Sequence, residues 1–164
     1  MPNLTPEKEL LILDALKAKI ESVAGAENVL VENPLIDSKQ DAVERLTVQN
    51  SDDQTEVKYI YISFLGFEDS ETDGCDDEPV VTLTYNAHVV WGFNERRGDE
   101  SFSEKDFKAL VLNLRNKFLE SRRELLPDCE HQPLKQQNFI LLADDPLTGA
   151  YSHFIDLILK VDIF

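Results

Sequence analysis

The chain has 164 residues, 42% of them hydrophobic, and its 32 acidic and 16 basic side chains give a formal net charge of −16. This charge argues against binding nucleic acid by neutralising its phosphates, and the hydrophobic content excludes the composition of a disordered chain. The length and the patterned apolar runs predict a single domain over residues 1–164 that buries about two-thirds of its unfolded surface.

No membrane association and no disulfide framework are expected. The uninterrupted apolar runs are only a few residues long, and the first residues carry no basic segment followed by an apolar one. The two cysteines, Cys75 and Cys129, lie in polar acidic stretches without a Cys-x-x-Cys spacing. This cysteine usage predicts a reducing, cytosolic origin.

The first predicted element is a helix of about 19 residues that begins after Thr5. Thr5 can cap the helix, Pro6 suits its first position, and Gly25 supplies a left-handed residue that ends it. Apolar residues recur between them at helical spacing: Ile12, Leu13, Leu16, Ile20 and Val23. The helix is therefore expected to bury one stripe.

Three strands are predicted next. A short strand is expected at residues 28–31, after which residues 43–49 are ambiguous but favour a strand, because Thr47 and Val48 precede a turn-rich segment. The strand expected at residues 57–65 has apolar side chains on both faces, which is typical of a strand covered on both sides.

A long strand at residues 80–93 shows the clearest alternation in the chain. It is longer than most strands, so we expect it to extend toward a neighbouring subunit or into a projecting hairpin. Residues 67–79 are predicted to form the hairpin loop between this strand and the one before it. Seven of the eleven residues from Glu68 to Glu78 are acidic.

The C-terminal part predicts one helix and two strands. Ser101 and Glu104 have the spacing of a capping box, the last turn is expected to hold Arg122 and Arg123, and Pro127 prevents continuation. The apolar face of this helix comprises Phe107, Leu110, Val111, Leu114 and Phe118. A polar loop with Cys129 and His131 is expected next, followed by strands at residues 139–143 and 151–164.

These elements predict an α+β fold in one domain. Its sheet is predominantly antiparallel or mixed, with about five to six strands and two helices packed on one face. Such helices leave the other face of the sheet uncovered, although Phe154, Ile158 and Phe164 lie on that face of the last strand. We therefore expect these three residues to contact another subunit or a partner.

The acidic loop is the one weak candidate for a metal site. Asp69, Glu71 and Asp73 occupy the first, third and fifth positions of a calcium-binding loop, but Val80 stands where such a loop needs glutamate. The favoured interpretation is a solvated hairpin tip, with a calcium-type cation as the alternative. The histidines and cysteines lack the paired spacings of a zinc site, so no cofactor is predicted.

No motif of a known catalytic class is present, and the chain is not expected to be an enzyme. Its charge, however, is segregated: residues 95–123 hold eight basic and six acidic groups, a balance of +2, so the other 135 residues sum to −18. Lys108, Arg115 and Arg122 recur every seven residues along the second helix. This basic stripe is either a solvated helix face or a docking surface for an acidic partner, including an identical subunit.

The order of these elements resembles the tail-terminator or tail-completion proteins of tailed bacteriophages. The likeness rests on the capped N-terminal helix, the long strand at residues 80–93, the helix at residues 107–119 and the final strands ending in residues 154–164. It includes no diagnostic motif, so it assigns no functional residue.

The resemblance implies a hexameric ring of identical subunits that joins the tail to the head at the head-proximal end of the tail tube. Its partners would be tail-tube and head-completion proteins, in a virion assembled in the host cytoplasm. DNA would pass through an acidic lumen without specific binding.

The alternative is an acidic protein that mimics DNA and inhibits a nucleic-acid-binding partner. Such a mimic needs carboxylates spaced along an extended surface, whereas here seven are concentrated within eleven residues. The concentration of charge favours the ring.

Overall fold

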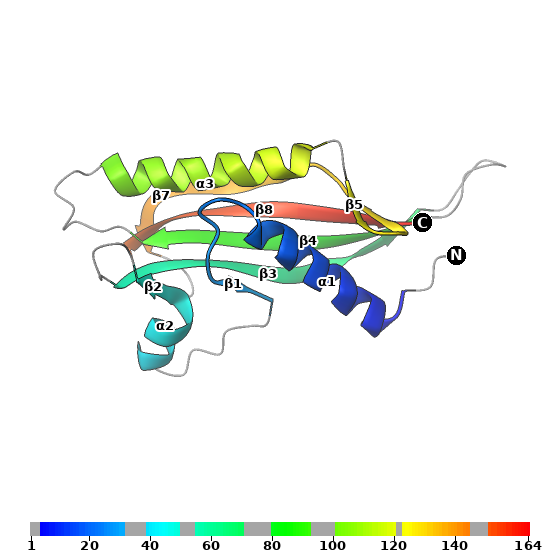
Figure 1. The fold of residues 1–164 in the computed structure, drawn as a ribbon, viewed down its shortest axis with the longest axis horizontal. Helices are drawn as coiled ribbons and strands as arrows, with labels where there is room; N and C mark the ends of the chain where they lie inside the picture. Colours follow the sequence, from blue (N-terminus) through cyan, green and yellow to red (C-terminus); the bar gives the residue numbers. More distant parts are fainter. Residues whose placement is uncertain are drawn as a thin grey trace.

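The structure is a computed structural model that describes residues 4–31, 39–49, 55–70, 80–92, 101–120, 123–144 and 151–164. Within these ranges the chain forms three helices and one mixed sheet of eight strands (Figure 1). The predicted α+β class is confirmed, and the sheet has more strands than the five to six expected.

The helices are α1 (Pro6–Glu21), α2 (Lys39–Leu46) and α3 (Ser101–Leu119). The strands are β1 (Val29–Leu30), β2 (Thr47–Gln49), β3 (Thr55–Asp69), β4 (Val81–Gly92), β5 (Glu124–Leu126), β6 (Cys129–His131), β7 (Lys135–Asp144) and β8 (Tyr151–Ile163).

The start of α1 follows the sequence prediction. Thr5 has extended backbone, and its side-chain oxygen accepts a hydrogen bond from the Lys8 amide at 3.2 Å. The helix ends at Glu21, somewhat earlier than expected. The Ser22 amide still donates to the Ala18 carbonyl, but the Val23 amide donates to the Ile20 carbonyl at 3.0 Å, three residues back, which closes the last turn. Gly25 has a φ of 88°, and this left-handed residue lies in the turn that leads to β1.

The long strands β3, β4 and β8 form the centre of the sheet. The strand order is β1-β3-β4-β8-β6-β5, with β2 beside β3 and β7 beside β8. β3 and β4 are the expected antiparallel hairpin, and every residue of β4 also pairs with β8. The short β1 runs parallel to β3, which makes the sheet mixed.

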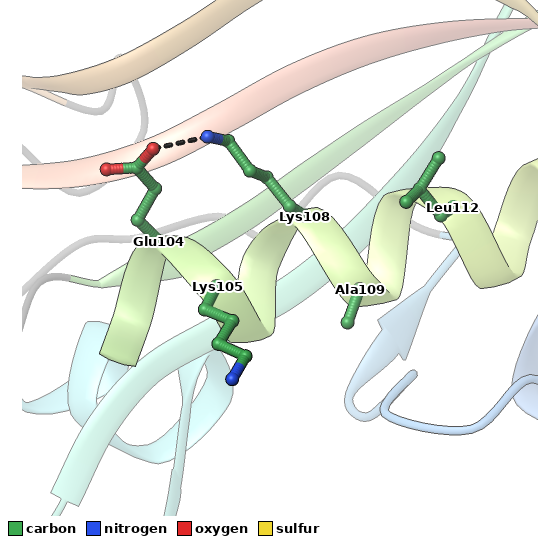
Figure 2. Close-up of a pocket in the computed structure, with 5 residues that line it drawn as sticks. All are labelled: Glu104, Lys105, Lys108, Ala109 and Leu112. Atoms are coloured by element: carbon green, nitrogen blue, oxygen red, sulfur yellow. Dashed lines mark hydrogen bonds and ion pairs between the residues drawn. The ribbon is translucent and has the colours of Figure 1, made fainter. Parts of the chain in front are cut away.

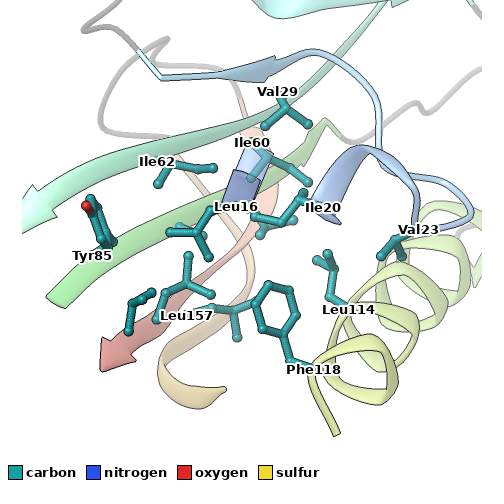
Figure 3. Packing of buried hydrophobic residues seen from close by; sticks show 14 of the residues in the cluster. Leu16, Ile20, Val23, Val29, Ile60, Ile62, Tyr85, Leu114, Phe118 and Leu157 are labelled. Atoms are coloured by element: carbon teal, nitrogen blue, oxygen red, sulfur yellow. The ribbon is translucent and has the colours of Figure 1, made fainter. Parts of the chain in front are cut away.

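The main core lies between one face of the sheet and the helices α1 and α3, as predicted. Leu16 and Ile20 of α1 and Leu114 and Phe118 of α3 point toward one another over this face (Figure 3). The Tyr85 hydroxyl also donates a hydrogen bond to the Glu9 carboxylate at 3.0 Å. This bond joins α1 to β4.

One predicted strand is partly a helix. Residues 43–49 were expected to be extended, but the chain is helical through Leu46 and only Thr47–Gln49 form β2. Leu46 is completely buried against Tyr59, Val90 and Phe154, on the face of the sheet opposite α1 and α3. Tertiary packing of Leu46 therefore keeps the residues before it helical, while the strand preference of Thr47 and Val48 is realised in β2.

Charged side chains surround Trp91 at the same end of the sheet. The indole nitrogen donates a hydrogen bond to the Glu56 carboxylate at 2.5 Å, and the Lys58 ammonium lies 3.9 Å from the ring centroid. Lys58 also pairs with the more exposed Glu27 at 3.4 Å. Two buried charged side chains are thus held around a single aromatic ring.

The segment predicted as a polar loop is a hairpin. Cys129 and His131 belong to β6, where they pair with β8 and are buried, while Glu130 between them is exposed. This alternation over three residues is too short to be distinguished from a loop in the sequence. The two strands of the hairpin β5–β6 account for the additional strands, and β7 begins earlier than predicted.

The second predicted helix ends before its expected last turn. α3 stops at Leu119, and Arg123 already precedes β5, where its carbonyl accepts a hydrogen bond from the His131 amide at 2.9 Å. Pairing within the β5–β6 hairpin therefore draws the chain out of the helix before Arg123. Arg122 lies outside the described residues.

The packing of α2 can be tested with Leu46→Ala. Because Leu46 is completely buried, we expect this change to lower the free energy of unfolding by about 3 kcal/mol. The matched control is Leu10→Ala, which truncates an exposed leucine of α1 and is expected to cost less than about 0.5 kcal/mol. Urea denaturation measures both. Equal losses for the two variants would contradict the placement of α2.

Candidate interaction surfaces

The weak metal prediction gains no support from the described residues. They bring no group of three or more His, Cys, Asp or Glu side chains together to hold a metal ion. Asp69 is exposed at the end of β3, whereas Glu71 and Asp73 lie outside the described ranges. No helix in the described part of the chain is long and apolar enough to cross a membrane.

The sheet face opposite α1 and α3, here called the far face, carries two carboxylates of β8. Asp162 accepts hydrogen bonds from Thr82 at 2.6 Å and from Gln132 at 3.0 Å. Asp156 accepts one from Asn86 at 3.2 Å, and His88 Nδ1 lies 2.9 Å from the same oxygen. Neighbouring strands thus hold both carboxylates, which makes the centre of the far face a cross-strand polar network.

Phe154, predicted to be uncovered on this face, is only 7% exposed. It packs with Leu46, Tyr59 and Val90 beneath α2, and its ring centroid is 5.5 Å from that of His88. The prediction that Phe154 is uncovered is wrong, because the third helix was not anticipated. Ile158 is partly exposed and Phe164 is half exposed.

The outer edge of β3 is a stronger candidate for contact with another molecule. β2 pairs with its first residues, and β1 pairs with Ile60 and Tyr61. From Ile62 to Asp69, no described strand other than β4 pairs with β3. An unpaired strand edge presents backbone donors and acceptors to any approaching chain.

A β-bulge shapes the side chains along this edge. The pairing register shifts between Phe64 and Gly66, and Gly66 has a φ of 150°, where a side chain would strain the backbone. Phe64 pairs with Tyr85, and Phe67 pairs with Leu83. Because Tyr85 and Leu83 share the α1 and α3 face, both phenylalanines lie on that face although they are three residues apart.

Three large apolar side chains of this edge are exposed. Phe64, Leu65 and Phe67 each expose half or more of their surface, and the exposed Glu68 and Asp69 follow directly. These five residues are called the β3 apolar edge. The sequence placed Phe64 and Leu65 in a strand covered on both sides, and Gly66 was the signal that the regular strand is interrupted there.

The second surface is the outer side of α3. Lys108 forms an ion pair with Glu104, and both residues line a shallow depression with Lys105, Ala109 and Leu112 (Figure 2). Arg115 is exposed and donates a hydrogen bond to Asn116 at 3.3 Å. The predicted basic residues 108 and 115 therefore share this side.

Two exposed leucines, Leu112 and Leu119, follow the same line along α3. At 3.6 residues per turn, the residues Lys105, Lys108, Leu112, Arg115 and Leu119 fall on one side of the helix. They are called the α3 outer stripe. The stripe lies opposite the buried side chains of α3, and its three cations distinguish it from the acidic β3 apolar edge.

Two buried histidines have a lowered pKa, chiefly because burial disfavours their charged form. His131 Nδ1 donates a hydrogen bond to the Gln132 carbonyl, which leaves Nε2 to accept from Lys19 at 2.6 Å. The ring of His153 stacks on Phe107 with centroids 5.6 Å apart. The neighbouring Cys129 thiol is also buried, and its pKa is raised to about 11.

Comparison of the sequence with protein-family models and with characterised proteins finds no match. The function must therefore be inferred from these surfaces and from the resemblance in element order.

The buried histidines predict acid sensitivity. Because their folded pKa lies below that of the unfolded chain, the unfolded state binds more protons as the pH falls below about 6.5. Stability should be full above that pH and should fall by up to about 1.4 kcal/mol per histidine at pH 5.5.

Urea denaturation at pH 7.5 and 5.5 measures the difference. His131→Gln and His153→Gln should each reduce it, even where they lower stability overall. The pH-dependent loss should disappear in the double variant. An unchanged loss in that variant would assign the acid sensitivity to other groups.

Proposed function

We propose that this protein is a structural subunit that assembles into a ring, in the manner of a phage tail terminator, and performs no catalysis. The observation that carries the proposal is the presence of two different exposed apolar surfaces with opposite charge. The β3 apolar edge combines three exposed apolar residues with Glu68 and Asp69, whereas the α3 outer stripe combines exposed leucines with three cations.

The two surfaces lie on different sides of the molecule. α3 runs along one long side, and β3 is the long strand farthest from it (Figure 1). A contact between two unlike surfaces of identical subunits is heterologous, and repeating it produces a closed ring or an open filament. Exposed apolar residues flanked by complementary charge are the usual composition of such contacts.

The net charge of −16 suits a ring through which DNA passes. An acidic wall repels phosphates, so DNA inside the lumen would not adhere to it. By the resemblance in element order, the ring would close the head-proximal end of a tail tube and join tail to head. Its partners would be tail-tube and head-completion proteins, and its location the virion.

The DNA-mimic alternative has less support. A mimic requires many accessible carboxylates, yet Asp156 and Asp162 of the far face accept hydrogen bonds from neighbouring strands. These two carboxylates of the far face are therefore engaged within the sheet.

Assembly can be measured by native mass spectrometry and negative-stain imaging over increasing protein concentration, with and without a phage tail-tube protein. We expect closed rings, formed either by the protein alone or on the tube. We also expect that the protein does not shift duplex DNA in a gel at physiological salt. A chain that stays monomeric under both conditions would contradict the proposal. Tight binding to a basic nuclease or repressor would instead favour the mimic.

A further inference from the structure

We propose that the α3 outer stripe of one subunit docks on the β3 apolar edge of the next copy. The inference rests on the proposed ring and names its contact. Exposed leucines of the stripe would meet exposed phenylalanines of the edge. Lys108 and Arg115 would face Asp69, which shares the side of the phenylalanines, and Glu68, which lies at the rim of the contact on the far-face side of the strand.

Charge supports a second copy of this chain as the occupant. The chain carries twice as many acidic as basic side chains, so two copies repel each other over most relative orientations. The α3 outer stripe is a local exception, with three cations and the anion Glu104 beside them. Placing it against the acidic end of the β3 apolar edge converts that repulsion into attraction and selects one orientation.

The apolar parts of the two surfaces also correspond. Leu112 and Leu119 are about two helical turns apart, a separation of roughly 10 Å. Phe64 and Phe67 face the same side of β3 because of the bulge, and since their partners Tyr85 and Leu83 are two residues apart, the two rings are separated by roughly 7 Å along the strand, a difference that the flexible leucine side chains can span. Two pairs of exposed apolar side chains can thus be covered together, and the nearby charges would form the rim of the contact.

The bulge explains why this edge accepts a helix rather than another strand. A regular edge strand invites pairing by a second strand, whereas a bulge interrupts the ladder and twists the edge. Here Gly66 interrupts the stretch from Ile62 to Asp69, where no strand in the described ranges pairs with the outer edge of β3. The exposed rings remain available while continuous strand addition is disfavoured.

The test exchanges the charges of the two surfaces. The stripe variant carries Lys108→Glu and Arg115→Glu, and the edge variant carries Glu68→Lys and Asp69→Lys. Each variant alone presents like charges at every proposed contact, so its dissociation constant for self-association should rise at least about tenfold. All four positions are exposed in the described structure, so circular dichroism and thermal melting should match the wild type.

Mixing the two variants provides the decisive measurement. In an alternating arrangement, the reversed stripe meets the reversed edge, and the two unchanged surfaces meet each other. Association should therefore recover in the mixture, and also in a single chain that carries all four changes. If two stripes or two edges contacted each other instead, the mixture would recover only dimers. That result would overturn the proposal.

A matched control separates local contact from total charge. Lys17→Glu with Lys135→Glu changes the net charge as much as the stripe variant does, but outside both surfaces. This control should associate nearly as the wild type does. Phe67→Ser and Leu112→Ser, which remove apolar contact area without altering charge, should each weaken association.

The outcomes also separate this inference from the proposed function. If the wild type forms rings and the charge-exchange variants behave like it, the named contact is wrong and the ring stands. If the wild type does not self-associate, the docking proposal is overturned. The tail role then depends on whether rings form on the tail-tube protein.

Discussion

The antiparallel ladder of β4 with β3 on one side and β8 on the other is the interaction on which the rest of the structure depends. Each residue of β4 pairs with β8, from Val81 opposite Ile163 to Gly92 opposite Ser152. Because side chains alternate along a strand, this register directs one set of side chains under α1 and α3 and the other to the far face. The position of the core, the polar network and the free edge of β3 all follow from it.

Much of this arrangement could be predicted from periodicity. The alternation in β4 and β8, the cap at Thr5 and the apolar stripes of α1 and α3 depend on neighbours within a few residues, and the structure bears them out. α2 could not be predicted in the same way, because its position depends on Leu46 packing against residues remote in the sequence. The hairpin β5–β6 was missed because three-residue strands carry too little pattern.

The candidate surfaces also differ in whether they depend on nearby or on distant residues. The spacing of Lys108 and Arg115 was sufficient to place both on one side of α3, because helix geometry is regular. Phe64 and Phe67 required knowledge of a bulge and of where β1 stops pairing, and neither is local. Phe154 was misplaced for the complementary reason, since the helix that covers it was not recognised. A single sequence gives little information about which distant segments cover a face of the sheet.

Trp91 is the single tryptophan of the chain, and its surroundings make it a spectroscopic reporter of one end of the sheet. Its indole nitrogen bonds to Glu56, and the Lys58 ammonium lies over its ring. Fluorescence emission should respond when the α2 end opens, because water would then replace these charged neighbours. Trp91 pairs with Lys58 at the last position of the ladder between β3 and β4, at the opposite end from the β3 apolar edge. Association through that edge would leave the emission unchanged, so one optical signal can follow folding independently of assembly.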